Sequence, residues 1–268
     1  MIPTLRFWLS LLGATAFYAS WMVLAALFRV RYRPGGVYDR MPKDYGSFML
    51  RVNGIRVSPT GLDRLNPAQS YVYVSNHLSW VDPWALVTTM PGRVRFVAKQ
   101  ELSRIPIFGQ ALRAGHHIIV DRDDRDAAVK AYAGAAKSIN EGFSAVVFAE
   151  GTRSRDGTLG EFKKGPFVLA IVAGVPVVPV LVEGTFEILK RGALVPHAGP
   201  VRLHIGEPIP TKGLTYEDRE RLAEQCREAM LAMGKGQKEK GKGEDGKAVG
   251  TRSEGESLRG RNTPEAIL

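Results

Sequence analysis

The 268-residue chain contains a single cysteine, Cys226, and so cannot form a disulfide bond within itself. Such a composition is compatible with a reducing compartment, where structural disulfides are rare. The chain also has no serine in a Gly-x-Ser-x-Gly context, and Cys226 lies in a charged segment with helical character. The sequence therefore offers no evident protein nucleophile for covalent catalysis.

Histidine is scarce as well, with five in the whole chain. Four of them, His116, His117, His197 and His204, have no spacing with cysteines or carboxylates that is typical of a ligand set. We therefore expect no structural metal.

Acidic residues are outnumbered, with 27 Asp and Glu against 37 Lys and Arg, which gives a formal net charge of +10. This excess favours an anionic partner, either a nucleic acid or an anionic membrane surface. No recognisable nucleic-acid-binding motif is present, so we expect no nucleic acid partner. The N-terminal segment favours a membrane.

Charge is absent between Arg6 and Arg29. The apolar stretch Phe7–Phe28 reaches the roughly 20 residues that a helix needs to span a bilayer. Trp8 and Trp21 suit the membrane interface. We expect residues 1–33 to form a membrane anchor helix, with a cleaved signal peptide and a helix lying in the interface as alternatives.

Basic residues follow this stretch directly: Arg29, Arg31, Arg33, Arg40 and Lys43. Positive charge tends to stay on the cytoplasmic side of a membrane. We therefore expect the protein at the cell membrane, with the body of the chain facing the cytoplasm.

Composition divides the rest of the chain into three parts. Glycine and proline predict a connector over residues 34–45, followed by a folded domain over residues 46–233. Residues 234–268 are rich in Lys, Gly and Glu and lack apolar periodicity, which predicts a disordered charged tail.

Short β-rich runs alternate with helical patterns along the domain. The strands are expected at 54–57, 71–75, 95–98, 117–120, 145–148, 177–182 and 201–205. The helices are expected at 83–90, 124–141, 167–173 and 216–233. This alternation predicts an α/β fold with a mixed, mostly parallel sheet flanked by helices.

The most informative segment reads Ser-Asn-His-Leu-Ser-Trp-Val-Asp, residues 75–82, after the apolar run 71–74. Asp82 precedes Pro83; aspartate is a common helix N-cap, and proline is favoured in a first helical turn. We therefore predict that Asp82 caps a helix starting at Pro83. His77 should lie in the turn after a strand, where its imidazole can meet the Asp82 carboxylate.

Such a pair can perform acid–base chemistry. An imidazole can accept a proton near neutral pH, and a carboxylate on its other nitrogen fixes the tautomer and stabilises the imidazolium. Since no protein nucleophile is evident, His77 would activate a substrate hydroxyl, with Asp82 orienting it. The residues of this segment alone are equally compatible with a buried structural histidine bonded to a capping aspartate.

Four segments together resemble the glycerolipid acyltransferase family, which contains the 1-acylglycerol-3-phosphate acyltransferases. In chain order they are Asn-His-Leu-Ser-Trp-Val-Asp at 76–82, Val-Ala-Lys at 97–99 with Ile-Pro-Ile-Phe-Gly at 105–109, Phe-Ala-Glu-Gly-Thr-Arg-Ser at 148–154 with Phe-Lys-Lys-Gly at 162–165, and Val-Pro-Val-Val-Pro at 175–179. The resemblance covers roughly residues 45–210. One departure is Ala149, where the family usually has proline.

This resemblance implies that Glu150, Gly151 and Arg153 bind the glycerol-phosphate acceptor, because a guanidinium binds phosphate well. The alternative is that Glu150 and Arg153 only pair with each other across a turn. Lys99, in the second segment, is expected to contact the acceptor phosphate. The family links the fourth segment to acyl-donor binding, whereas its prolines, Pro176 and Pro179, also fit an edge strand or a bulge.

The sequence thus predicts a membrane-associated acyltransferase. It would move a fatty acyl group from acyl-CoA or an acyl carrier protein to the sn-2 hydroxyl of 1-acylglycerol-3-phosphate (lysophosphatidic acid), giving phosphatidic acid. No cofactor beyond the thioester co-substrate is expected. The alternatives are transfer to another lyso-lipid, such as a lyso-ornithine lipid, and a non-catalytic lipid-binding membrane protein.

Overall fold

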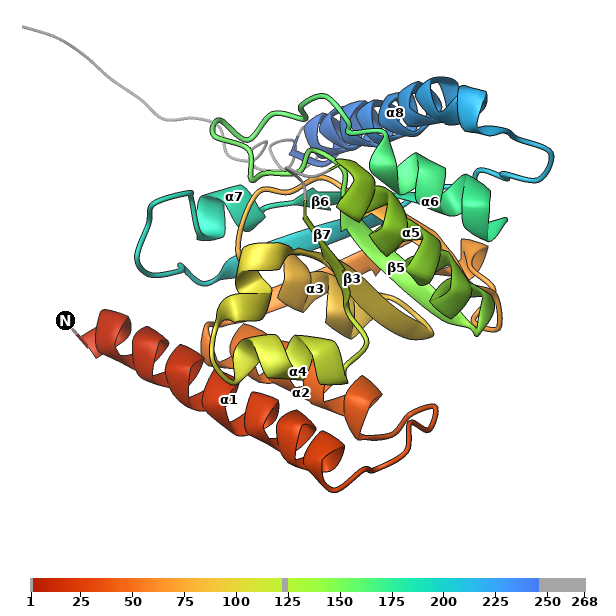
Figure 1. Ribbon diagram of the computed structural model, residues 1–268. Helices are drawn as coiled ribbons and strands as arrows, with labels where there is room; N and C mark the ends of the chain where they lie inside the picture. The colour runs from red at the N-terminus through yellow and green to blue at the C-terminus, as the bar shows by residue number, and fades with distance from the viewer. Residues whose placement is uncertain (1, 122–124, 246–268) are drawn as a thin grey trace, which may run out of the picture. The chain divides into compact units, whose positions relative to one another are not determined.

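The structure is a computed structural model that describes residues 2–121 and 125–245 (Figure 1). The chain separates into two compact units, Met1–Met233 and Gly234–Leu268. This division coincides with the predicted end of the folded domain at residue 233. Of the predicted tail, residues 246–268 lie outside the described residues.

One seven-stranded sheet forms the centre of the first unit (Figure 1). The strands are β1 (Ile55–Thr60), β2 (Val72–Ser75), β3 (Arg93–Lys99), β4 (Ile118–Val120), β5 (Phe143–Phe148), β6 (Val177–Glu183) and β7 (Gly199–Ile205). Their order is β1-β7-β6-β2-β5-β3-β4, and all neighbours are parallel except β6 and β7. Each predicted strand coincides with an observed one, and the mixed, mostly parallel α/β fold is confirmed.

Helices cover both faces of this sheet. They are α1 (Ile2–Leu27), α2 (Val37–Val52), α3 (Asp82–Thr89), α4 (Phe108–Ala114), α5 (Arg125–Asn140), α6 (Gly165–Ala173), α7 (Thr185–Ile188) and α8 (Arg219–Asp245), with short 3-10 helices η1 (Leu62–Arg64), η2 (Gln100–Arg104) and η3 (Tyr216–Asp218). All four helices predicted in the domain are present. Asp123 and Asp124, either of which could cap α5 by residue type, lie outside the described residues.

The two faces of the sheet follow from alternation along its strands. On β2 and just before it, Tyr71 and Tyr73 belong to a core shared with α2 and α3, whereas Val72 and Val74 belong to a core shared with α5, α6 and α8. The result is a three-layer arrangement with the sheet in the middle. Cys226 is fully buried in the second core, where burial raises the pKa of its thiol.

The predicted connector 34–45 is wrong, because α2 begins at Val37. Pro42 lies inside this helix and removes one backbone hydrogen bond without stopping it. Packing compensates: α2 contacts both α1 and α3 and buries Met49 and Leu50 in the core. Tertiary burial therefore overrides a local helix-breaking signal.

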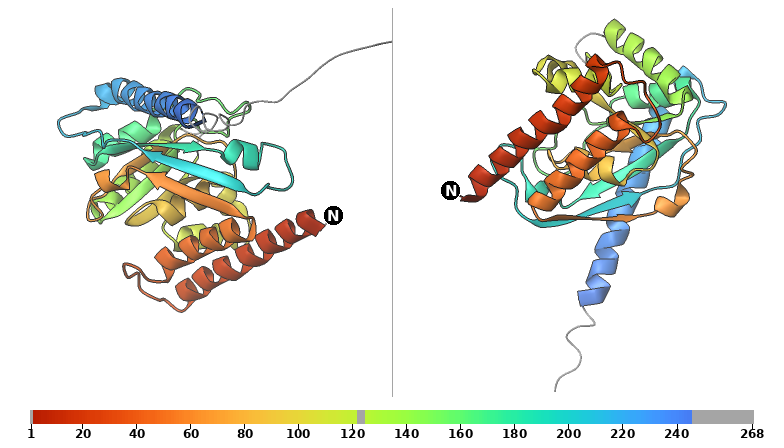
Figure 2. Two further views of the ribbon diagram at one scale, coloured as in Figure 1. Left: turned by 180° about the vertical axis from the view of Figure 1, so that it is seen from behind. Right: turned by 90° about the horizontal axis from the view of Figure 1, so that it is seen from below.

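Helix α1 lies alongside α2 and α4 rather than projecting from the domain (Figure 2). One face is buried along the whole helix, through Phe7, Ala14, Ala19, Met22 and Ala25. The opposite face is apolar and exposed, with Leu5, Trp8, Leu9, Leu12, Phe17, Trp21, Leu24 and Leu27. By length and composition the segment Thr4–Leu27 could also cross a membrane.

The predicted disorder of 234–245 is also wrong, since α8 continues to Asp245. Lys, Gln and Glu in this segment are good helix formers, and extending an existing helix avoids the cost of nucleation.

Pro179 lies within β6, which is an internal strand between β7 and β2. Its missing amide hydrogen is tolerated because the pairing is irregular there. Val177 pairs with Ile209 and Val180 pairs with Ile205. The segment opposite β6 therefore contains one residue more than β6 does between these two pairs. The predicted edge strand is therefore wrong, whereas the offset in pairing is what the predicted bulge would produce.

Candidate active site

The predicted site residues gather at the carboxyl end of β2, in the middle of the sheet. β2 lies between β5 and β6, and the chain crosses to opposite sides of it. In open α/β sheets such a point of reversal is where ligands bind. The register pairs Ser75 with Phe148, so the residues just after β2, including His77, lie beside Glu150.

The turn after β2 is held by side chains that bond to distant backbone. Asn76 is buried, and its amide donates to the Val182 carbonyl at 2.9 Å while accepting from the Val182 amide at 2.7 Å. The Ser79 hydroxyl donates to the Leu189 carbonyl at 2.9 Å. These bonds fix the turn to β6 and to the end of α7, which gives His77 a rigid support.

His77 and Asp82 meet as predicted, with 2.7 Å between Nδ1 and Oδ2. The same Asp82 oxygen accepts from the amides of Leu78 at 2.7 Å and Ser79 at 2.8 Å. The predicted N-cap is wrong in detail: Asp82 is the first residue of α3 and its carboxylate faces back into the turn. Pro83 follows in the first turn of α3, a position where proline is favoured.

Aromatic stacking fixes the plane of the imidazole. The His77 ring stacks on Phe148 with 3.9 Å between centroids and an angle of 16°. Asp82 is fully buried, whereas the His77 side chain is 15% exposed. Among the described residues no hydrogen-bond partner occupies Nε2 of His77, so this nitrogen can accept a proton from a bound molecule.

Glu150 bridges two backbone segments. Its Oε1 accepts from the His77 amide at 2.9 Å and its Oε2 accepts from the Gly160 amide at 3.0 Å. Burial raises the pKa of this carboxyl, outweighing the lowering effect of those two amides and of His77. No salt bridge joins Glu150 to Arg153 within the described part of the chain, which disfavours the alternative that they only pair with each other.

Arg153 lies over the ring of Trp80, with 4.6 Å from its guanidinium carbon to the ring centroid. Burial lowers the pKa of Arg153, and the nearby positive charge of Arg191 lowers it further. Gly151 adopts a φ of 76°, a left-handed conformation that favours glycine and lets the chain turn toward Arg153. The structure thus brings a half-buried cation to the edge that carries His77.

Lys99 ends β3, whose carboxyl end opens on the same edge as β2 and β5. Its side chain forms an ion pair with Glu101 and is about half exposed. The structure therefore places Lys99 at this edge, with this ion pair made to Glu101 rather than to the turn that carries His77. Two further residues enter the site here, Trp80 and Arg191. Trp80 falls inside the segment 76–82 singled out from the sequence, whereas no local pattern marks Arg191.

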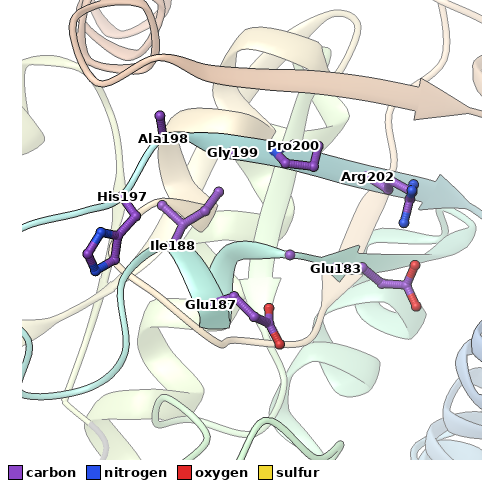
Figure 3. A pocket seen from close by; sticks show the side chains of 9 residues that line it. Glu183, Glu187, Ile188, His197, Ala198, Gly199, Pro200 and Arg202 are labelled. Atoms are coloured by element: carbon purple, nitrogen blue, oxygen red, sulfur yellow. The ribbon is translucent and has the colours of Figure 1, made fainter. Parts of the chain in front are cut away.

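An open pocket of 440 Å³ lies apart from these residues, between α7 and the start of β7 (Figure 3). Glu187 comes from α7, while Glu183 and Arg202 come from neighbouring strands and face each other across the ladder. None of the six predicted site residues lines it. The His77–Asp82 pair therefore lies outside this pocket.

The chain is similar in sequence to known proteins. The Acyltransferase family matches residues 56–183, a span that contains all the predicted site residues. The chain is 31% identical to human 1-acyl-sn-glycerol-3-phosphate acyltransferase alpha, over 81% of this chain and 79% of the human one. It is 32% identical to 1-acyl-sn-glycerol-3-phosphate acyltransferase from Limnanthes douglasii, over 70% of this chain and 66% of the plant protein.

A solved structure is similar as well. The 1-acyl-sn-glycerophosphate (LPA) acyltransferase PlsC from Thermotoga maritima superimposes with a TM-score of 0.71 at 27% identity, covering 87% of this chain and 95% of that one. The imidazole–carboxylate pair, its place in the sheet and these similarities agree. The chain belongs to the acyltransferase family that includes the 1-acyl-sn-glycerol-3-phosphate acyltransferases, and it is an acyltransferase.

Proposed function

We propose that this enzyme transfers a fatty acyl group from a thioester to the sn-2 hydroxyl of 1-acylglycerol-3-phosphate, giving phosphatidic acid. The observation that carries the proposal is the His77–Asp82 pair, with its 2.7 Å contact, at the same sheet edge as the half-buried Arg153. A base for a hydroxyl and a cation for a phosphate are the two groups that this acceptor requires.

In this mechanism Nε2 of His77 takes the proton from the acceptor hydroxyl while its oxygen attacks the thioester carbonyl. Asp82 holds the ring through Nδ1 and stabilises the imidazolium. The tetrahedral intermediate then collapses, the carbon–sulfur bond breaks, and the imidazolium returns the proton to the leaving thiolate. Charge and protons balance without any protein nucleophile. Positioning of the two substrates supplies much of the acceleration.

The acceptor phosphate is assigned to Arg153, with Lys99 as a second cation. The ring of Trp80 supports the guanidinium through a cation–π contact. Glu150 and Gly151 shape the turn that carries Arg153. The thioester is acyl-CoA or an acyl carrier protein conjugate, and no further cofactor is needed.

The enzyme is further proposed to work at the cell membrane, with its catalytic domain facing the cytoplasm. The exposed apolar face of α1 supports contact with lipid, and Arg29, Arg31 and Arg33 directly after it suit an anionic cytoplasmic surface. Because the other face of α1 packs on α2 and α4, a helix lying in the interface fits better than one that spans the bilayer.

The activity is tested with the purified full chain, oleoyl-CoA and a panel of acceptors, following thiol release and the acylated product. Lysophosphatidic acid should be the best acceptor, ahead of monoacylglycerol, lysophosphatidylcholine and a lyso-ornithine lipid. Faster transfer to the lyso-ornithine lipid would favour that alternative acceptor. Undiminished turnover in a folded His77→Ala protein would overturn the mechanism.

The membrane arrangement has its own test, which exploits the buried state of the single cysteine, Cys226. A cysteine is placed at Thr4 in one protein and at Phe28 in another, and each is exposed to an impermeant maleimide on vesicles containing phosphatidylglycerol. Labelling of both ends from the outside supports a helix lying in the interface. Labelling of one end alone would show that α1 spans the bilayer.

A further inference from the structure

The loop between β5 and α6, residues 149–164, contains no helix or strand, yet it carries Arg153 and contacts the turn that carries His77. Backbone outside helices and strands depends on individual hydrogen bonds for its position. The Ser154 amide donates to the His77 carbonyl at 2.8 Å, which ties the loop to the turn after β2. The Lys163 amide donates to the Ala149 carbonyl at 2.8 Å, which joins the two ends of the loop. The position of this loop and that of His77 are therefore linked.

The middle of the loop is tied at Gly160. Its amide donates to Oε2 of Glu150 at 3.0 Å, and the other oxygen of Glu150 accepts from the His77 amide at 2.9 Å. Both oxygens of this carboxylate are thus engaged by backbone amides. A Cβ at Gly160 would lie 3.0 Å from Glu150 Oε2, which shows how closely the loop approaches the carboxylate.

The carbonyl side of Gly160 is bound by the last helix. Nε of Arg227, on α8, donates to the Gly160 carbonyl at 3.2 Å. Arg227 is well placed to act as a fixed point, because the preceding residue, Cys226, is fully buried in the core shared with α6. Figure 1 shows α8 running beside this loop.

We infer that Arg227 is a positioning residue for acyl transfer, acting through Gly160 and Glu150 on the backbone of His77. The path runs from α8, which lies outside the residues 56–183 that match the Acyltransferase family, to the turn that carries His77. It also assigns Glu150 to organising the site, with its carboxylate bound to protein amides rather than to the acceptor. This inference rests on the proposed role of His77 as the base.

The test compares Arg227→Met with Arg227→Lys in the full chain, and uses Arg221→Met as the matched control. Arg221 lies on the same helix, is exposed, and bonds Asp218 rather than the loop. Arg227→Met should lower kcat by about threefold to tenfold, as expected for loss of one supporting hydrogen bond, with a smaller change in KM. Lysine, which keeps a donor, should restore part of kcat, and Arg221→Met should match the wild type.

A double-mutant cycle identifies the path. In a Glu150→Gln background the further change Arg227→Met should reduce kcat by no more than about twofold, because the link is already broken. Equal effects in both backgrounds would overturn the inference, as would a wild-type kcat for Arg227→Met. Equal thermal stability of Arg227→Met and Arg221→Met excludes general unfolding as the cause.

A second readout is independent of turnover. The ring signals of His77 in a proton–nitrogen NMR spectrum, assigned with His77→Gln, should shift in Arg227→Met and stay in place in Arg221→Met. An unmoved His77 signal contradicts the inference even if kcat falls. If the wild type shows no transferase activity, the proposed function fails, whereas the spectrum still reports whether Arg227 positions the histidine.

Discussion

His77 lies 2.7 Å from Asp82 and His204 lies 2.9 Å from Glu183, so by distance the two pairs are alike. Their remaining ring nitrogens differ. Nδ1 of His204 is 3.1 Å from the Thr60 hydroxyl and its side chain is 5% exposed, whereas Nε2 of His77 has no bonding partner in the described ranges and its side chain is 15% exposed. A general base needs a nitrogen that substrate can reach.

The location of each pair gives the same lesson. His204 belongs to β7 and bonds to neighbouring strands on either side, through Thr60 of β1 and Glu183 of β6, so it joins three strands. His77 lies beyond the end of β2, where the strand ladder stops and a ligand can approach. An imidazole–carboxylate contact thus becomes a candidate for catalysis only with an open nitrogen at an open edge.

The largest expected effect comes from exchanging the two histidines for glutamine. His77→Gln should lower kcat by about 10²–10⁴-fold, the usual contribution of a general base. His204→Gln should keep kcat near the wild-type value and instead lower the free energy of unfolding by about 1–3 kcal/mol, since it removes the two bonds that join β7 to β1 and β6. Steady-state kinetics and thermal unfolding of both proteins check this. Similar loss of kcat in both would break the comparison.

The two carboxylates of these pairs, Asp82 and Glu183, should differ almost as much in their effect on kcat. In Asp82→Asn the side-chain oxygen can still accept from Leu78 and Ser79, but the group can no longer stabilise an imidazolium, so kcat should fall by about 10²–10⁴-fold. Glu183→Gln should leave kcat close to that of the wild type. Measuring kcat and melting temperature for both variants separates a catalytic role from a structural one. A wild-type kcat for Asp82→Asn would contradict the role proposed for Asp82.

The cation beside His77 provides a smaller, substrate-dependent effect. Arg153→Met should raise KM for lysophosphatidic acid by about tenfold to a hundredfold, because a hydrogen bond to a charged group contributes about 1.5–3 kcal/mol. KM for monoacylglycerol, which lacks the phosphate, should change little. An equal rise for both acceptors would remove Arg153 from phosphate recognition.

A third histidine, His117, extends the comparison, because its contribution to stability should depend on pH. Nδ1 of His117 accepts from the Phe96 amide at 3.0 Å, and burial, followed by the charges of Arg95 and His116, lowers its pKa from 6.5 to about 3. The folded state therefore resists a proton that the unfolded chain accepts. The stabilising contribution of the neutral ring should be complete above pH 6.5 and decline as the pH falls toward 3, by about 1.4 kcal/mol per pH unit at most.

His117→Gln is the variant that reports this contribution. Its melting temperature should fall less steeply than that of the wild type between pH 6.5 and pH 4, measured at constant ionic strength. Parallel curves for the two proteins would show that His117 does not titrate in this way.

The strands and the main helices could be predicted from local patterns, because alternating or continuous apolar runs bounded by glycine and proline report burial directly. Helix α2 could not, since Pro42 and the preceding Pro34-Gly35-Gly36 are breaking signals locally. Its stability comes from packing on α1 and α3, and that packing is invisible in a window of the sequence. The position of Pro179 inside an internal strand has the same cause, because an offset in the pairing opposite β6 accommodates it.

For the site, the residues of one turn predicted the His77–Asp82 contact, whereas Glu150, Gly151, Arg153 and Lys99 were predicted from the resemblance to the acyltransferase family. Only the tertiary structure decided how they are connected. In the structure the Asp82 carboxylate accepts from the amide of Leu78, in the turn that carries His77, rather than capping its own helix. Both oxygens of Glu150 accept from backbone amides. Such contacts join residues 73 and 10 positions apart. They depend on which strand ends lie side by side, and that is set by the sheet as a whole.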